Sequence, residues 1–133
     1  MAMQEYDLSS FAQAPESPLF AEVKRWILDG FKSAGGEPDT GSKLYATFLQ
    51  AGLPYPQMVC AQQVHCGPEA MGYEHAAQGL RSLLPAVERN RVATATEIEI
   101  DTLANRLRED AIARHAVMFT PRLVGAWSRA TQP

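Results

Sequence analysis

The stretch Leu123-Val124-Gly125-Ala126-Trp127, near the end of the chain, is a compact apolar run that predicts a β-strand. Pro121 lies just before this run, at the start of the strand, where a missing backbone N–H is tolerated. Two further strands are predicted, one over Met1–Tyr6 and one over Gln57–His65. The expected sheet therefore has about three strands, which is few for a self-sufficient α/β sheet.

The segment between the first two strands has the periodicity of helices. Apolar residues at helical spacing predict a helix from Pro18 to Gly35, where glycine can end it. Ser42 is expected to cap a short helix that stops at Gly52. The stretch Ser9–Pro18, rich in serine, alanine and proline, is expected to be a loop.

The longest helical region is predicted between the second and third strands. Helical spacing indicates one helix over Met71–Arg89 and another from Ile100 onward. On the second of these helices, Arg106 and Asp110 are expected to form an exposed ion pair. Residues 68–119 are therefore expected to form a helical cap inserted into the sheet domain.

The composition favours one globular domain spanning residues 1–133. Hydrophobic residues make up 46% of the chain and charged residues 20%, which suits a folded chain with one modest core. The net charge of −3 argues against a nucleic-acid partner, because phosphate binding relies on clusters of lysine and arginine.

The chain is expected to be cytoplasmic and to have no membrane partner. Its longest apolar runs are too short to span a bilayer, and Met1-Ala2-Met3 lacks the basic and apolar regions of a signal peptide. Cys60 and Cys66 are expected to lie too far apart along one strand to form a disulfide. Reduced thiols are consistent with a reducing compartment.

Several short motifs occur in an order that suggests a family. They are Gln4-Glu5-Tyr6-Asp7-Leu8, Gly35-Gly36 followed by Asp39-Thr40-Gly41, Phe48-Leu49-Gln50-Ala51-Gly52-Leu53, Leu83-Leu84-Pro85, Ile100-Asp101-Thr102-Leu103-Ala104 and Leu123-Val124-Gly125-Ala126-Trp127. In this order, and over nearly the whole chain, they resemble the C-terminal half of class I S-adenosylmethionine-dependent methyltransferases. The resemblance implies a parent enzyme, a transferase of one-carbon groups, that methylates a small molecule.

The resemblance also implies a fold. Such methyltransferases have a seven-stranded Rossmann-like sheet, whose last strand is antiparallel to the others and lies between the fifth and the sixth. Met1–Tyr6 would be the fifth strand, Gln57–His65 the sixth and Arg122–Arg129 the seventh, with the first four strands outside this sequence. The expected fold class is thus α/β, with a partial Rossmann-like methyltransferase sheet and a helical cap.

The cofactor is expected to bind elsewhere in the parent enzyme. No Gly-x-Gly-x-x-Gly turn follows a strand in these 133 residues, and the acidic residue that would hold the cofactor's ribose has no match either. S-adenosylmethionine is therefore implied for the full-length parent, and no cofactor is expected for this chain alone. By itself the chain is expected to recognise the methyl acceptor without being active.

Acceptor recognition is expected at one edge of the predicted sheet. Ligands of open α/β sheets lie outside the carboxyl ends of the parallel strands, and the cap would cover that edge. The expected acceptor-binding residues are Tyr6, Asp7, Tyr73 and His75. No catalytic residue is assigned.

Several of these residues also have another interpretation. Asp7 could orient or deprotonate an acceptor hydroxyl or amine, or it could be a turn residue that ends a strand. Tyr6 could line a pocket or pack on a helix. His65, Cys66 and His75 match no common zinc-site spacing, so no metal is expected.

Two non-enzymatic functions remain open. An unpaired strand edge at Met1–Tyr6 could pair with a second copy and give a two-fold symmetric homodimer. Alternatively, the chain could be a stand-alone small-ligand-binding domain that uses a pocket under the cap helices.

Overall fold

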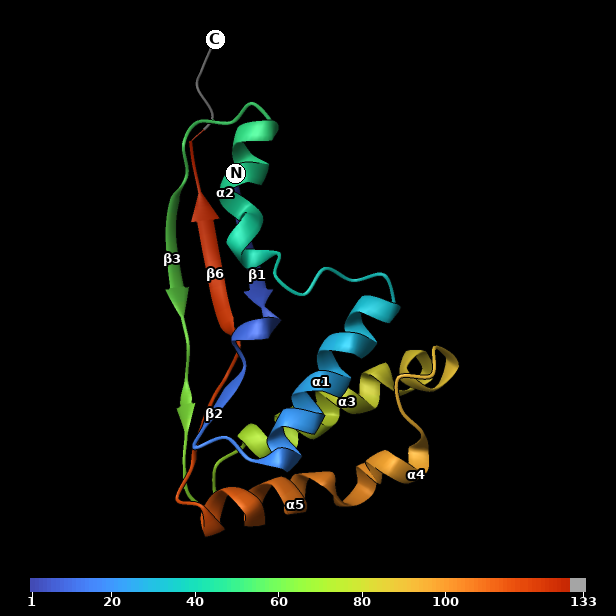
Figure 1. The fold of residues 1–133 in the computed structure, drawn as a ribbon. Coiled ribbons are helices and arrows are strands. Elements are labelled where there is room, and N and C mark those ends of the chain that lie inside the picture. The colour runs from blue at the N-terminus through green and yellow to red at the C-terminus, as the bar shows by residue number, and fades with distance from the viewer. Residues whose placement is uncertain (130–133) are drawn as a thin grey trace.

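The computed structural model describes residues 1–129 as a mixed α/β chain built on a long, narrow set of strands (Figure 1). A three-stranded antiparallel sheet joins β1 (Ala2–Asp7), β6 (Arg122–Trp127) and β3 (Gln57–Ala61), with β6 in the centre. The predicted central and antiparallel position of the last strand is confirmed. This strand ends at Trp127, two residues before the expected Arg129.

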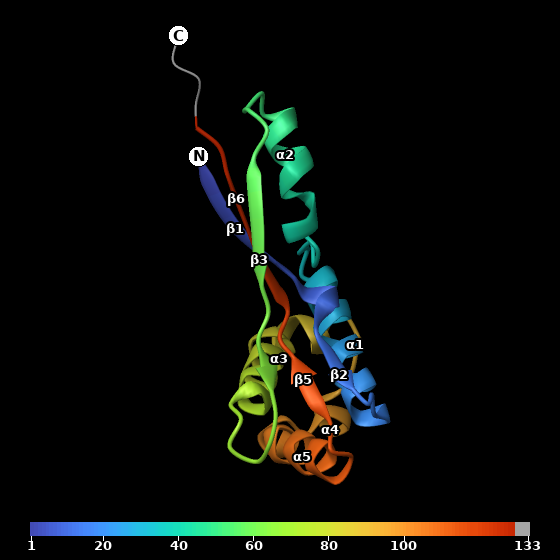
Figure 2. The same cartoon turned by 90° about the vertical axis from the view of Figure 1, so that its left-hand side faces the viewer.

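A second three-stranded sheet continues the first. It joins β2 (Ala12–Ala14), β5 (Val117–Phe119) and β4 (Val64–His65), with β5 in the centre. Along the chain, β1 is followed by β2, β3 by β4, and β5 by β6. Each strand of the first sheet thus has a chain neighbour in the second, and the second sheet continues the first after a bend (Figure 2). The expectation of a plain loop over Ser9–Pro18 is therefore wrong, because β2 lies within it.

Polar side chains bridge the break between the two sheets, which we call the junction. Gln62 Nε2 donates hydrogen bonds to the backbone oxygens of Ser10 at 3.2 Å and Thr120 at 2.7 Å. The hydroxyl oxygen of Ser10 accepts from the backbone N–H of Arg122 at 2.8 Å. These contacts replace the ladder bonds that the chain loses where its strands bend.

Three long helices surround the main core. They are α1 (Pro18–Ser33), α3 (Gly72–Arg89) and α5 (Ile100–Ala113), and the short α4 (Ala95–Ile98) leads into α5. The core contains Phe20, Val23, Trp26, Tyr73, Leu80, Val87, Leu103, Leu107 and Met118. The segment predicted as a helical cap, residues 68–119, thus contains α3, α4, α5 and also β5, and it shares its core with α1.

Local signals explain where these helices begin. Ser17 accepts a hydrogen bond from the backbone N–H of Phe20 at 3.1 Å, and Pro18 occupies the first turn of α1. Thr94 caps α4 through the backbone N–H of Glu97 at 3.1 Å. None of the helices in residues 1–129 combines the length and the apolar character needed to cross a membrane.

A smaller core lies on one face of the first sheet. There α2 (Leu44–Gln50), which directly follows the turn η2 (Gly41–Lys43), packs Leu44 and Phe48 against β6. The turn η1 (Leu8–Ser10) joins β1 to β2. The opposite face carries the exposed side chains of Tyr6, Val59 and Trp127. In Figure 2, β1, β6 and β3 lie together and α2 is drawn to their right.

Candidate functional site

Two adjoining pockets lie at the junction, where β1 ends and β6 begins. The first, which we call the apolar pocket, has a volume of about 160 Å³ and lies between α1, α3 and the strands. The second, the outer pocket, has a volume of about 560 Å³ and opens beside the exposed face of the first sheet. Leu8, His75, Thr120 and Pro121 line both pockets. The two pockets therefore meet at these four residues.

The structure brings two of the four expected acceptor-binding residues together here. Tyr6, which is exposed on β1, lines the outer pocket, and His75 in the first turn of α3 lines both pockets. The imidazole ring of His75 lies edge-on to that of His65, with 6.4 Å between ring centroids. His75 is exposed, so a bound molecule could reach its imidazole.

Asp7 lies on the other face of β1 and lines neither pocket, as strand alternation requires of a residue next to Tyr6. Its carboxylate accepts hydrogen bonds from the backbone N–H of Ser42 at 2.7 Å and from the Ser42 hydroxyl at 2.5 Å. A side chain at Gly41 would bring its Cβ within 2.8 Å of the same carboxylate. Asp7 therefore fastens η2 to the end of β1.

The bonds to Asp7 also correct the expected role of Ser42. The sequence predicts that Ser42 caps α2, but the residue before this helix is Lys43, and no side chain caps it. Arg122 Nη2 lies 3.7 Å from the Asp7 carboxylate and supports the same corner of the fold. The arrangement agrees with the interpretation of Asp7 as a residue that ends a strand.

Tyr73 belongs to the main core, not to the pockets. Only 1% of its surface is exposed, and burial raises the pKa of its phenol. The guanidinium of Arg108 lies 5.4 Å from the centre of its ring and is held there by Glu74, 3.0 Å away. On α3, the pocket residues are Gly72, His75, Ala76 and Gly79, so Tyr73 lies on a different side of the helix.

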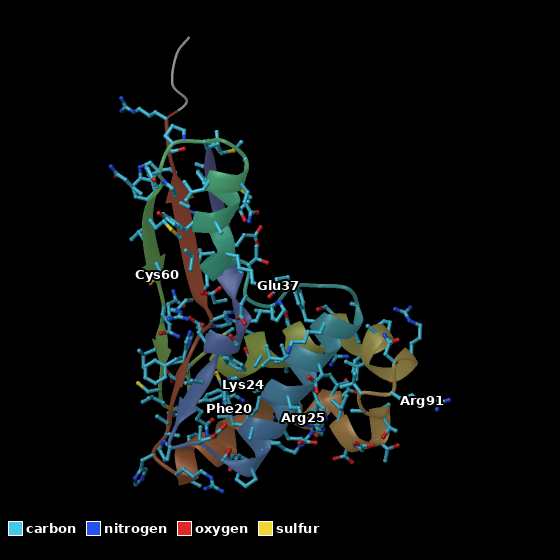
Figure 3. All side chains as sticks on the ribbon, turned by 45° about the horizontal axis from the view of Figure 1, so that its top comes forward. Phe20, Lys24, Arg25, Glu37, Cys60 and Arg91 are labelled. Atoms are coloured by element: carbon cyan, nitrogen blue, oxygen red, sulfur yellow. The ribbon has the colours of Figure 1, made fainter. Side chains whose placement is uncertain are left out.

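Lys24 is a pocket residue that the sequence reasoning missed. It lines the apolar pocket, is only half-exposed, and makes no ion pair with any side chain of residues 1–129. The neighbouring Arg25 is different, because it pairs with Glu22 at 2.6 Å and with Asp29 at 3.7 Å. Figure 3 shows Lys24 on the side of α1 nearer the strands.

A sequence signal for Lys24 does exist. Phe20 lies four residues before it, and Ile27 and Leu28 lie three and four residues after it. These positions share one side of a helix, so Lys24 interrupts an apolar surface.

Metal binding has no obvious location in the described part of the chain. Within residues 1–129, no three side chains of His, Cys, Asp or Glu come close enough together to hold an ion. Cys60 and Cys66 are both exposed thiols without a disulfide bond. The polar side chains among the described lining residues are the imidazole of His75, the phenol of Tyr6, the ammonium group of Lys24, the hydroxyl of Thr120 and the amide of Gln63.

Comparisons of the chain with protein-family models, with curated proteins and with solved structures found no match. The functional assignment therefore depends on the geometry of the chain itself. Two features matter most, namely the order of the strands in the first sheet and the pair of pockets at the junction.

Proposed function

We propose that this chain is the acceptor-binding part of an S-adenosylmethionine-dependent methyltransferase that acts on a small molecule. One observation carries the proposal, namely the strand order β1-β6-β3 with β6 antiparallel to both neighbours. This is the order that the resemblance implies for the fifth, seventh and sixth strands of a Rossmann-like methyltransferase sheet. The proposal thus treats the first sheet as one end of that larger sheet.

The position of the pockets supports the same proposal. They lie beyond the carboxyl end of β1, at the edge where ligands of open α/β sheets bind. Methyl transfer is a direct displacement, so the protein contributes mainly the alignment of the acceptor. His75, which borders both pockets, is placed to take a proton from an acceptor hydroxyl or amine.

The cofactor-binding unit would join this chain at the free edge of β1. In the described structure β1 pairs with β6 on one side, and on its other side only Asp7 forms a bridge, to Asp39. The backbone from Ala2 to Tyr6 therefore has an open edge that can accept a strand. We propose that polypeptide outside these 133 residues, in the same or another chain, supplies this strand and the S-adenosylmethionine site.

A radiolabelled methyl-transfer assay on the native protein tests this function. The protein would be isolated from its cells with antibodies against this chain and incubated with labelled S-adenosylmethionine and a small-molecule extract. We expect label to enter extractable small molecules, and the demethylated cofactor product should inhibit this incorporation. A native protein that binds no S-adenosylmethionine and transfers no label would overturn the proposal.

Self-association is a second candidate function, and the free β1 edge favours it as well. Two copies could pair their Ala2–Tyr6 edges antiparallel about a two-fold axis and so double the first sheet. Tyr6 is exposed on β1 itself and could add apolar contact across this seam, whereas Val59 and Trp127 lie on β3 and β6, away from it. Sedimentation tests the second candidate, and a monomer at high concentration would count heavily against the homodimer.

A further inference from the structure

We propose that the apolar pocket binds small apolar carboxylates, with the ligand's anionic group at Lys24 and a ring-sized body between α1 and α3. This inference deepens the proposed function, because it names the chemical class of the methyl acceptor. It rests on that function only for the statement that the bound molecule is methylated. The binding itself depends on the pocket alone.

The size and lining of the apolar pocket determine which apolar group of a ligand it can hold. Its volume is about 160 Å³. A protein cavity of about 150 Å³ lined by apolar side chains accommodates a benzene molecule. The apolar lining residues include Phe11, Ile27, Leu28, Ala76 and Met118. One six-membered ring therefore matches the space in both volume and polarity.

The charge at the pocket selects an anion. Lys24 is the one lysine or arginine among the residues that line the apolar pocket, and neither pocket has an aspartate or glutamate among its described lining residues. The chain as a whole carries a net charge of −3, so acidic residues outnumber basic ones. The absence of aspartate and glutamate from the described pocket lining is therefore not expected from the overall composition. The Lys24 ammonium group is half-buried and has no ion pair within residues 1–129, so an arriving carboxylate would give it a charge-assisted hydrogen bond.

A glycine on α3 keeps the pocket open. A Cβ added at Gly79 would meet no heavy atom within 4 Å, so packing does not require a glycine there. Glycine within a helix nevertheless destabilises it relative to alanine. Gly72 differs from Gly79, because packing does require a glycine there: an added Cβ would lie 3.0 Å from the His65 ring and 3.1 Å from the Met118 sulfur. Gly79 is exposed and lines the apolar pocket, so a larger side chain there would reduce the space open to a ligand.

The outer pocket offers room for a substituent on the ring. It meets the apolar pocket at His75 and extends to Tyr6, where its volume of about 560 Å³ exceeds that of the ring site. A ligand with its carboxylate at Lys24 can therefore carry a second group past His75. That group would lie near the carboxyl end of β1, where the proposed methyl transfer takes place.

Three one-ring probes of different charge test the inference on the purified chain. Benzoate, benzamide and benzylamine would be titrated while two-dimensional NMR follows the backbone amides. Benzoate should bind at least about tenfold more tightly than benzylamine, which corresponds to one charge-assisted contact. The largest shifts should occur at Leu28, Gly79 and Thr120, which line the apolar pocket.

Two variants and a matched control identify the groups responsible. Lys24→Met should remove the preference for benzoate, whereas Arg25→Met, at an exposed and paired residue, should keep it. Gly79→Leu should weaken all three probes, because the new side chain fills the space. The inference is overturned if no probe binds, if benzylamine binds as well as benzoate, or if Lys24→Met changes nothing. These outcomes would overturn only the proposed ligand class. They would not test the proposed methyltransferase function, which depends on the strand order and on the open edge of β1.

Discussion

Asp7 accepts two hydrogen bonds from Ser42, one from its backbone N–H at 2.7 Å and one from its hydroxyl at 2.5 Å. The two residues are 35 positions apart in the sequence. Asp7 is 2% exposed, although it stands at the end of a strand. The pair therefore joins β1 to the turn that leads into α2, and it gives Asp7 a structural role.

Replacing Asp7 should lower the stability of the chain. Asp7→Ala removes both bonds from a buried charged acceptor, so we expect a loss of about 2 kcal/mol in the free energy of unfolding. Urea denaturation measures this loss. In a Ser42→Ala background the same substitution should cost less, because the hydroxyl bond is already absent. An equal cost in both backgrounds would show that Asp7 acts through other contacts.

Breaking the polar bridge at the junction should also weaken the fold. Gln62→Ala removes the bonds to the backbone oxygens of Ser10 and Thr120, and we expect a loss of about 1 kcal/mol. Gln57→Ala is the matched control, because Gln57 is exposed on β3 and its side chain makes no hydrogen bond in the described residues. Thermal unfolding compares the two variants, and equal effects would contradict the role of Gln62.

Two helix glycines should respond in opposite ways to alanine. At Gly30 in α1, a Cβ would lie 2.6 Å from the Cγ2 of the buried Val87, so Gly30→Ala should destabilise the α1–α3 contact by about 1 kcal/mol. Gly79→Ala adds a Cβ in open space and should stabilise α3 by about 0.5 kcal/mol. Denaturation midpoints that move in the same direction for both variants would contradict this packing.

The contribution of Asp110 to stability should depend on pH. Burial acts to raise the pKa of Asp110, but the nearby Ser17 hydroxyl and the Arg114 guanidinium, which donates to the carboxylate at 3.0 Å, outweigh it, and the pKa lies below its usual value. A lowered carboxylate pKa stabilises the fold above the ordinary aspartate pKa of about 3.9, and this stabilisation is lost as the pH falls through the folded-state pKa.

We therefore expect Asp110→Asn to cost about 1 kcal/mol near neutral pH and progressively less in acid. Urea denaturation of both proteins from about pH 7 down to about pH 3 measures the difference. Glu109→Gln is the control, because Glu109 is exposed and has no ion pair within residues 1–129. A cost that stays constant into acid would contradict the lowered pKa.

The main strands and helices could be predicted from the sequence because their signals are strong. The apolar run Leu123–Trp127 and the helical spacing after Pro18 both correspond to observed elements. The strands β2 and β5 could not be predicted, because three residues are too few to show an alternating pattern. They form where the chain bends back beside the longer strands.

Side-chain partners were harder to predict than elements. The expected ion pair between Arg106 and Asp110 is wrong, because Asp110 pairs with Arg114 at 3.0 Å. Arg106 instead donates to the backbone oxygens of Ile98 and Glu99 and so closes the end of α4. Helical spacing allows Asp110 to pair with either Arg106 or Arg114. Arg106 is engaged instead by the carbonyl groups at the end of α4, which the sequence pattern does not place.

Only part of the lining of the candidate site could be predicted from the sequence. The expected edge of the sheet does contain pockets, and Tyr6 and His75 line them. Asp7 and Tyr73 were expected there too, but alternation along β1 and the rotation of α3 turn them elsewhere. Lys24 could not be assigned from helical spacing alone, because the spacing predicts the helix but not which of its sides faces a pocket.

Isothermal titration with S-adenosylmethionine tests the central claim most directly, on this chain and on the native protein in whatever chain or complex it occurs. We predict one tight site per native protein and no tight, stoichiometric binding to residues 1–133 alone. Tight binding to the isolated chain, or none to the native protein, would contradict the account.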